Sequence, residues 1–148
     1  MQKISVRIAQ QEDLNAIHEL VGELAIYEKA ENEFVATLEM YRKDFADGVF
    51  EAIVAETGGE IVGMALYYLS YSTWKGKMLF LEDFVVRQSY RRRGIGDLLF
   101  DEVVSIAKAK GCRLLKWQVL DWNKPALGFY AKKNATIEKN WWNGKIIF

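Results

Sequence analysis

Hydrophobic and polar residues follow two different periods along this chain, and together they predict a mixed α/β fold. Residues 3–8 alternate with a period of two, as in a short strand. Apolar side chains then recur at helical spacing over residues 14–24. Thr37 is placed to cap a second helix, which Gly48 is expected to end.

The centre of the chain predicts an antiparallel meander of strands. Residues 51–57 and 60–71 are rich in apolar side chains and flank Gly58-Gly59. A glycine pair in that position indicates a tight hairpin turn. A third strand is expected over residues 77–87, directly after the second.

The next region predicts a strand–helix–strand unit. Apolar side chains on one face favour a helix over residues 94–110, which Gly111 ends, and residues 113–120 favour a strand. Because a crossover helix joins the two strands that flank it, these strands are expected to be parallel.

The end of the chain predicts a short helix and a last pair of strands. Asn123-Lys124-Pro125 opens the helix, which runs through Lys133. Residues 135–140 and 145–148 predict a final hairpin. No repeat or linker interrupts this order, so we expect residues 1–148 to form a single domain.

Composition excludes several classes of protein. The apolar share of 51% and the charged share of 27% are typical of a globular protein, and 20 basic residues balance 20 acidic ones. The absence of a net positive charge argues against a nucleic-acid partner. We also expect no membrane partner, because the sequence shows neither a long apolar run nor a signal-like segment. His18 and Cys112 are the only residues of their kinds, so we expect no metal site, no internal disulfide and a cytoplasmic location.

The sharpest motif lies at the expected junction between the third strand of the meander and the following helix. It reads Arg91-Arg92-Arg93-Gly94-Ile95-Gly96-Asp97. A helix N-terminus attracts anions, glycines let a phosphate approach the backbone, and arginines add charged donors. The motif therefore predicts a pyrophosphate site. A plain basic turn is the alternative.

Two adjacent carboxylates, Glu82 and Asp83, interrupt an apolar strand. In a regular strand they point to opposite faces of the sheet. Charges in such a strand are costly unless they are paired or lie at a solvated cleft. Either they serve the structure, by an ion pair with a basic residue or by protecting a sheet edge, or one of them orients a cationic amine or accepts its proton, directly or through water.

These features, together with Tyr130 on the helix that Asn123 caps, resemble the GNAT superfamily of N-acetyltransferases. The resemblance is closest to its diamine (spermidine/spermine) and thialysine branch and covers nearly the whole chain. Asn134 departs from the glycine usual in the family, but asparagine also tolerates a left-handed conformation. Further matches are Glu23-Leu24-Ala25-x-Tyr27-Glu28, Val62-Gly63-Met64-Ala65-x-Tyr67-Tyr68, Tyr71-x-x-Trp74-x-Gly76-Lys77 and Trp122-Asn123-x-Pro125-x-x-x-Phe129-Tyr130.

The resemblance implies a fold and a co-substrate. The expected fold is a twisted mixed sheet, splayed between its fourth and fifth strands, with helices on both sides. The implied co-substrate is acetyl-CoA, with its pantetheine arm along the third meander strand and its pyrophosphate on the glycine loop. The implied cofactor-binding residues are Phe84, Val85, Val86, Arg91, Arg92, Arg93, Gly94, Ile95, Gly96, Asp97, Asn123, Lys124, Pro125 and Ala126.

The resemblance also implies catalytic roles and an acceptor. Tyr130 matches the general acid that protonates the leaving thiolate, and Glu82 matches the base, acting through water. The acceptor is a small cationic amine, either a polyamine or diamine or a thialysine-like amino acid, and we expect a homodimer. The implied acceptor residues are Tyr27, Glu28, Glu82, Asp83, Trp117 and Gln118.

Two other functions remain open from the sequence alone. A non-catalytic acyl-CoA-binding module would keep the glycine loop and dispense with turnover. A nucleic-acid-binding domain would use Arg91 to Arg93, but the isolated loop and the absent net charge disfavour it.

Overall fold

The computed structural model describes residues 2–148. The chain forms two compact units, Met1–Gln118 and Val119–Phe148, and the first contains one five-stranded sheet in the order β1-β2-β3-β4-β5. Within the described residues, no helix is long and apolar enough to cross a membrane. The strands are β1 (Ser5–Ile8), β2 (Glu51–Thr57), β3 (Glu60–Ser72), β4 (Gly76–Val86) and β5 (Leu114–Trp117).

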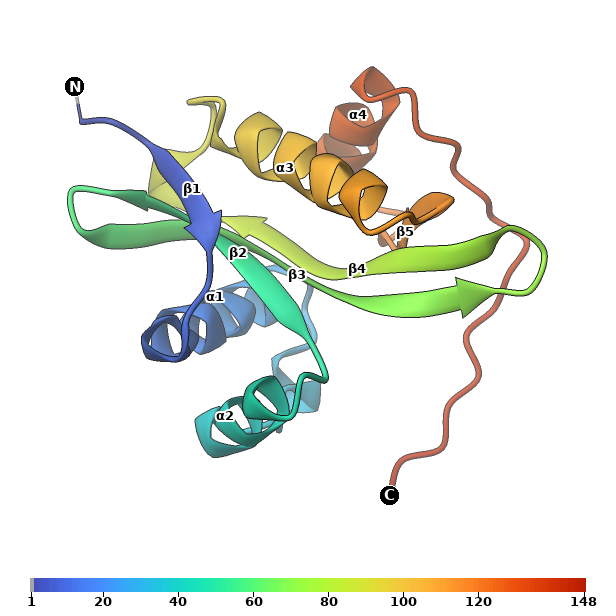
Figure 1. The fold of residues 1–148 in the computed structure, drawn as a ribbon, viewed down its shortest axis with the longest axis horizontal. Coiled ribbons are helices and arrows are strands. Elements are labelled where there is room, and N and C mark those ends of the chain that lie inside the picture. The colour runs from blue at the N-terminus through green and yellow to red at the C-terminus, as the bar shows by residue number, and fades with distance from the viewer. Residues whose placement is uncertain (1) are drawn as a thin grey trace. The chain divides into compact units, whose positions relative to one another are not determined.

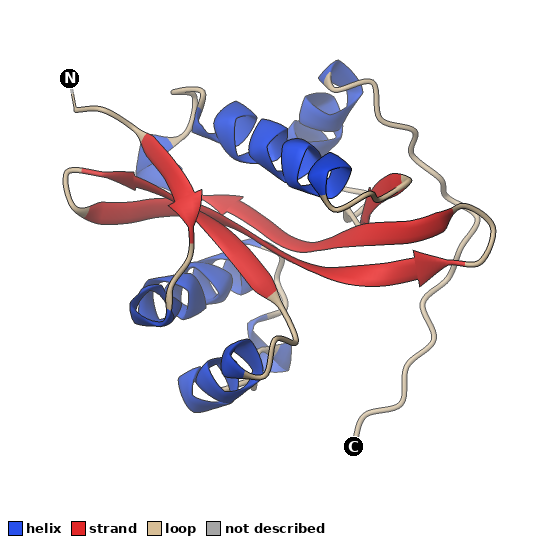
Figure 2. Ribbon diagram, viewed as in Figure 1, coloured by secondary structure: helices blue, strands red, loops and turns tan. Residues whose placement is uncertain are grey.

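The predicted antiparallel meander is confirmed. β1, β2, β3 and β4 pair antiparallel in sequence, and Figure 2 shows β2 to β4 as long adjacent strands. Thr57 pairs with Glu60 across a two-residue turn, in which Gly58 and Gly59 have φ of 57° and 78°. Glycine adopts this conformation at no steric cost, which explains the pair at this turn.

Helices cover both faces of the sheet in the first unit. α1 (Leu14–Tyr27) and α2 (Leu38–Ala46) lie on one face, and α3 (Ile95–Ala109) lies on the other (Figure 1). Thr37 caps α2 as predicted, because its Oγ1 accepts a hydrogen bond from the Met40 amide at 3.2 Å.

Each face has its own apolar core. On the first face the buried side chains of α1, such as Leu14 and Ile17, pack with Val54, Met64 and Val85 of the sheet. On the other face Ile95, Leu99 and Val103 of α3 are buried and α3 contacts β2, β3 and β4. Burial of these apolar side chains is the main contribution that holds the helices on the sheet.

β5 pairs only with the first half of β4, and the two strands are splayed beyond it. β4 and β5 are parallel, and their pairing runs from Met78–Leu114 to Leu81–Trp117. The predicted strand over residues 113–120 is therefore too long. The pairing stops where β4 becomes irregular, and a strand that loses its neighbour also loses its ladder of hydrogen bonds.

The second unit contains α4 (Lys124–Lys132) and an extended tail. α4 begins as predicted, and Asn134 takes φ of 62° after it, the left-handed conformation expected of asparagine there. The predicted final hairpin is wrong, because residues 135–148 contain no strand. An isolated hairpin is marginally stable, and the tail keeps its large apolar side chains, such as Trp142 and Phe148, exposed.

Close packing of α3 on β3 gives a stability prediction. A Cβ added at Gly63 would lie 3.1 Å from Leu99 Cδ1 and 3.1 Å from the Val85 carbonyl oxygen. Gly63→Val is therefore expected to lower the free energy of unfolding by roughly 1–3 kcal/mol through overpacking, measured by urea denaturation.

Gly22→Ala is the control for this substitution. A Cβ there meets the Phe34 ring at an ordinary 3.4 Å, and alanine favours the interior of α1. This control is expected to keep or raise stability. A Gly63→Val protein as stable as the wild type would contradict close packing at this point.

Candidate active site

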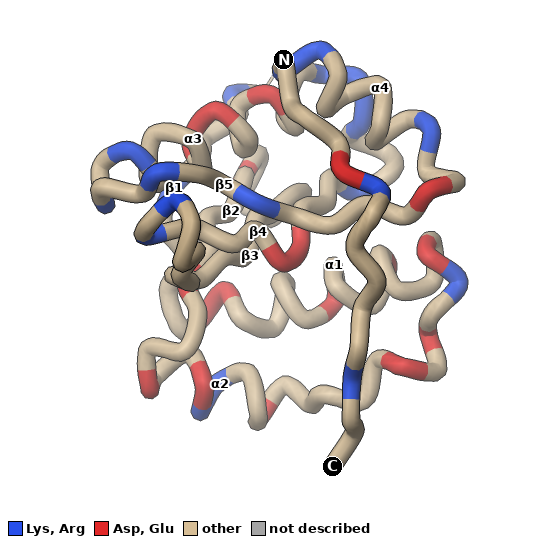
Figure 3. Tube along the Cα trace, turned by 90° about the vertical axis from the view of Figure 1, so that its right-hand side faces the viewer, with Lys and Arg blue, Asp and Glu red and all other residues tan. Residues whose placement is uncertain are grey.

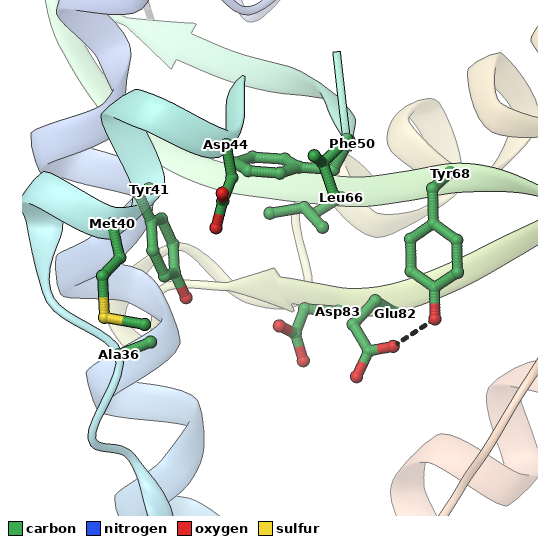
Figure 4. Close-up of a pocket in the computed structure, with 10 residues that line it drawn as sticks. Ala36, Met40, Tyr41, Asp44, Phe50, Leu66, Tyr68, Glu82 and Asp83 are labelled. Carbon is green, nitrogen blue, oxygen red and sulfur yellow. Dashed lines mark hydrogen bonds between the residues drawn. The ribbon is translucent and has the colours of Figure 1, made fainter. Parts of the chain in front are cut away.

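β4 carries a bulge at Glu82 that changes the direction of its side chains. The register pairs Asp83 with Leu66. The next pair joins Leu81 to Tyr67, so Glu82 has no residue opposite it in the ladder. An extra residue of this kind re-aims the side chains beside it. Glu82 and Asp83 consequently line the same pocket (Figure 4), and the prediction of opposite faces is wrong.

The pocket lies between α2 and the sheet and has a volume of about 370 Å³. One part of its wall is apolar and can hold an aliphatic chain. The other part is polar and contains only carboxyl and phenol groups among its ionisable side chains. The apolar members are Ala36, Met40, Val49, Phe50 and Leu66, and the polar ones are Tyr41, Asp44, Tyr68, Glu82 and Asp83.

Tyr68 holds the Glu82 carboxylate in place. Its hydroxyl donates a hydrogen bond to Glu82 Oε1 at 2.8 Å, drawn as a dashed line in Figure 4. Burial raises the pKa of Tyr68 well above its usual value, and the hydrogen bond and charge of Glu82 raise it further. Tyr68 is therefore a constant donor at neutral pH, and it fixes the direction of one carboxylate oxygen.

Asp83 is half-buried and unusually basic. Burial raises its pKa to about 7, and the charges of Glu82 and Glu28 add to the shift. The pKa of Tyr41 is also raised, to about 12, by burial and then by the charges of Asp83 and Glu82. The pocket therefore has a strongly negative potential, which favours a bound cation and opposes a further negative charge.

The predicted acceptor residues of α1 do not line this pocket. Tyr27 lines a second pocket of about 280 Å³, together with Glu23, Val85 and Arg91. The Arg91 guanidinium carbon lies 5.4 Å from the centre of the Tyr27 ring, a cation–π contact. Glu28 follows α1, and burial raises its pKa. The α1–α2 connection contains Glu28, Glu31 and Glu33, with Lys29 among them, and Figure 3 shows mainly acidic segments in red between the two helices.

The backbone at the end of β4 has the arrangement expected for an added strand. The Arg87 amide donates to the Val62 carbonyl of β3 at 2.7 Å. Because hydrogen bonding alternates along an antiparallel strand, Val85 directs its backbone groups toward β3, whereas Phe84 and Val86 direct theirs away from it. The Val86 carbonyl accepts a hydrogen bond from Arg91 Nε at 3.0 Å.

The glycine loop has the conformation of an anion site. Arg92 and Gly94 have left-handed φ values of 64° and 79°, and Gly94 caps α3 without a side chain. The first amides of α3 have no acceptor within the helix, and a Cβ on Gly94 would meet no atom within 4 Å. The loop is thus open to a phosphate group that approaches its amides.

The three arginines of the loop have different surroundings. The Arg93 guanidinium carbon lies 5.0 Å from the centre of the Tyr90 ring, and Arg91 is held by Val86 and Tyr27. Arg92 is exposed and has no hydrogen bond or ion pair to any of residues 2–148. These residues fit the diphosphate of a nucleotide cofactor, with Arg92 as the most available charge. Ile95, Gly96 and Asp97 form the first turn of α3.

The second unit contains the other predicted residues. Asn123 caps α4, because its Oδ1 accepts a hydrogen bond from the Ala126 amide at 3.3 Å, and Lys124 and Pro125 form the first turn. Tyr130 is buried, and its ring centre lies 5.6 Å from that of Phe129.

The last predicted acceptor residues lie at the end of β5. Trp117 is the final residue of β5, its ring packs edge-on against Phe100 at 5.5 Å, and Gln118 follows it. Among residues 2–148, no cluster of His, Cys, Asp and Glu is suited to hold a metal ion. His18 packs against the Phe34 ring, and its Nε2 lies 2.8 Å from the Ala36 carbonyl oxygen.

Sequence reasoning did not find Tyr41, Asp44 or Tyr68. Tyr41 and Asp44 lie about one turn apart on α2, so their spacing places them on the same side of that helix. This was the only signal that linked them. Tyr68 stands in a motif of the resemblance, but its hydrogen bond to Glu82 depends on strand pairing that the sequence does not specify.

Sequence relatives and a family model agree on one family. Residues 13–135 match the model described as the acetyltransferase (GNAT) family. The thialysine N-epsilon-acetyltransferase of Bos taurus is 40% identical over 142 residues, covering 89% of this chain and 84% of that protein. The human spermidine/spermine N(1)-acetyltransferase-like protein 1 is 31% identical over 153 residues, covering 95% of this chain and 22% of that protein.

Solved structures have the same fold. An aminoglycoside acetyltransferase from an uncultured soil metagenomic sample, in complex with sisomicin, superposes with a TM-score of 0.80 at 19% identity, covering 98% of this chain and 96% of that one. Aminoglycoside N-acetyltransferase AAC(6')-Iy, in complex with CoA, has a TM-score of 0.80 at 18% identity and the same coverage of 98% and 96%. The chain therefore belongs to the GNAT family of acetyltransferases, as the sequence resemblance predicts.

Proposed function

We propose that this protein transfers the acetyl group of acetyl-CoA to a primary amine of a small cationic acceptor, a polyamine, diamine or thialysine-like compound. The observation that carries the proposal is the placement of Glu82 and Asp83, by one bulge, in a single pocket of negative potential. The relatives named for thialysine and spermidine/spermine acetylation support an amine acceptor.

The cofactor is held by backbone groups and by the glycine loop. The backbone groups of Phe84 and the amide of Val86 face away from β3, and the loop at the start of α3 takes the pyrophosphate. Arg92 supplies an unengaged positive charge there. Residues 123–126, which the family resemblance assigns to the cofactor, are part of the proposed cofactor site. When bound, acetyl-CoA supplies the activated acetyl group.

Proton transfer is the principal work of the side chains. An alkylammonium has a pKa near ~10.4, so a neutral amine at pH 7 costs roughly 4–5 kcal/mol. Glu82, oriented by Tyr68, accepts the proton through water, and Asp83 holds the ammonium group beside it. Tyr130 donates its hydroxyl proton to the leaving thiolate. Direct attack by the amine requires no covalent nucleophile.

The proposal extends to the assembly. Residues 1–148 act as one N-acetyltransferase domain, which the family match across both units supports. The protein works as a cytoplasmic homodimer, and the exposed Trp141 and Trp142 provide apolar surface for the contact between copies.

Acetyl transfer can be tested by following free thiol release from acetyl-CoA with spermidine, putrescine, thialysine and lysine as acceptors. Release that depends on the acceptor is expected. Tyr130→Phe and Glu82→Gln are each expected to lower kcat by about 100-fold or more, because each removes one proton-transfer group. Tyr71→Phe is the matched control, since Tyr71 is an exposed tyrosine of β3, and it is expected to leave kcat unchanged.

Two results would argue against this proposal in different ways. Tight acetyl-CoA binding in calorimetry without release from any acceptor would favour a non-catalytic acyl-CoA-binding module. Full activity in Tyr130→Phe would remove that residue from the mechanism.

The burial of Asp83 also predicts a pH-dependent stability. Its pKa is about 7 in the folded protein and 3.8 in a solvated chain. Between these values the folded state binds more protons than the unfolded state, so its stability falls as the pH rises from about 4 to about 7. Asp83→Asn removes this penalty and is expected to be more stable than the wild type at pH 8, by roughly 1–3 kcal/mol.

Urea denaturation at pH 4 and pH 8 measures this difference, which is expected to vanish at the lower pH. Asp121→Asn, in an exposed loop, is the control and should show no such dependence. If Asp83→Asn and the wild type were equally stable at pH 8, ionisation of Asp83 would not destabilise the folded protein, and the prediction would be wrong.

A further inference from the structure

The acidic groups of the pocket lack the cations that neutralise acids elsewhere in the chain. Asp13 is paired with Arg7 at 2.7 Å, and Asp47 with Lys43 at 2.7 Å. Within residues 2–148, Asp44 and Asp83 have no ion pair or hydrogen bond to their carboxylates. Both are half-buried, so their charges are only partly screened by water. These two carboxylates are therefore available to a cationic ligand.

The acids are distributed over two elements on different sides of the cavity. Asp44 projects from α2 toward the cavity, whereas Glu82 and Asp83 project from β4 (Figure 4). Met40, Phe50 and Leu66 contribute apolar surface to the same cavity. This arrangement suits a molecule with two cationic ends and an aliphatic chain between them, since a charge can meet carboxylates at each end.

The same lining opposes an acceptor that carries a carboxylate. Among the described residues that line the cavity there is no Lys, Arg or His to pair with one. The raised pKa of Asp83, caused by burial and by the charges of Glu82 and Glu28, shows that an added negative charge is already unfavourable there. An amino-acid acceptor would bring its α-carboxylate into this potential without a partner.

We infer that the pocket selects acceptors that have a second ammonium group and no carboxylate, and that Asp44 is the residue that determines this specificity. The inference rests on the proposed function and refines it. The acceptor of this chain would thus differ from thialysine, the amino acid for which the relatives are named. Asp44 recognises the distant ammonium group, whereas Glu82 and Asp83 bind and deprotonate the ammonium group that reacts.

Acceptors of nearly equal length test the charge at the far end. Cadaverine carries a second ammonium group, pentylamine carries no second charge, 6-aminohexanoate carries a carboxylate, and lysine is cadaverine with an α-carboxylate. We expect kcat/KM for cadaverine to exceed that for pentylamine and for lysine by about tenfold each, and 6-aminohexanoate to be the poorest.

Asp44→Asn tests the residue itself. It is expected to lower kcat/KM for cadaverine by about tenfold and that for pentylamine by much less, and urea denaturation reports whether the variant is folded. Asp47→Asn is the matched control. It removes a carboxylate near the end of α2 that is paired with Lys43 outside the pocket, and the preference for cadaverine should persist.

The outcomes separate the inference from the function on which it rests. Equal or better turnover of lysine than of cadaverine would overturn the selection against carboxylates while acetyl transfer stands. An unchanged cadaverine preference in Asp44→Asn would overturn the role of Asp44. If no amine is acetylated but calorimetry shows tighter binding of cadaverine than of lysine, the proposed function fails and the selectivity of the pocket stands.

Discussion

The bulge at Glu82 is the constraint on which the site depends, because it changes the strand at the point where β4 leaves β5. Before it, β4 is paired on both sides, with β3 and with β5. After it, β4 keeps only β3, and alternate residues direct their backbone groups away from the sheet. One irregularity thereby gives a backbone edge that faces away from β3 and a pair of neighbouring carboxylates, the two features on which the proposed cofactor and acceptor sites rest.

The carboxylate pair has a cost that the rest of the fold must offset. Burial and mutual repulsion hold the pKa of Asp83 near 7, so its charged form is disfavoured in the folded protein. Two well-packed apolar layers, one on each face of the sheet, provide stability against this cost. Sites that hold like charges close together are common where a protein must bind or deprotonate a cation.

Two regions of opposite charge lie near the C-terminal part of β4. The loop before α3 combines arginines with amides that have no acceptor within the helix and suits an anion. The pocket beside α2 contains only acidic and phenolic ionisable groups and suits a cation. The two regions therefore favour ligands of opposite charge, and like-charge repulsion discourages binding in the wrong one.

The sequence by itself determined the helices, the first four strands and the glycine loop. Periodicity, the Thr37 cap, the glycine turn and the glycine loop are local features, and local backbone preferences decide them. The family resemblance rested on the same short motifs, which is why it identified the correct fold.

Tertiary structure alone decided which side chains share a pocket and which segments become strands. Register set the bulge, so Glu82 and Asp83 lie together although their spacing predicts opposite faces. Packing of α2 on the sheet brought Asp44 to the same cavity. A strand also requires a neighbour, and the alternating residues 135–148 lack a ladder within the described chain. Pairing between distant segments is a property of the folded chain, and no local pattern encodes it.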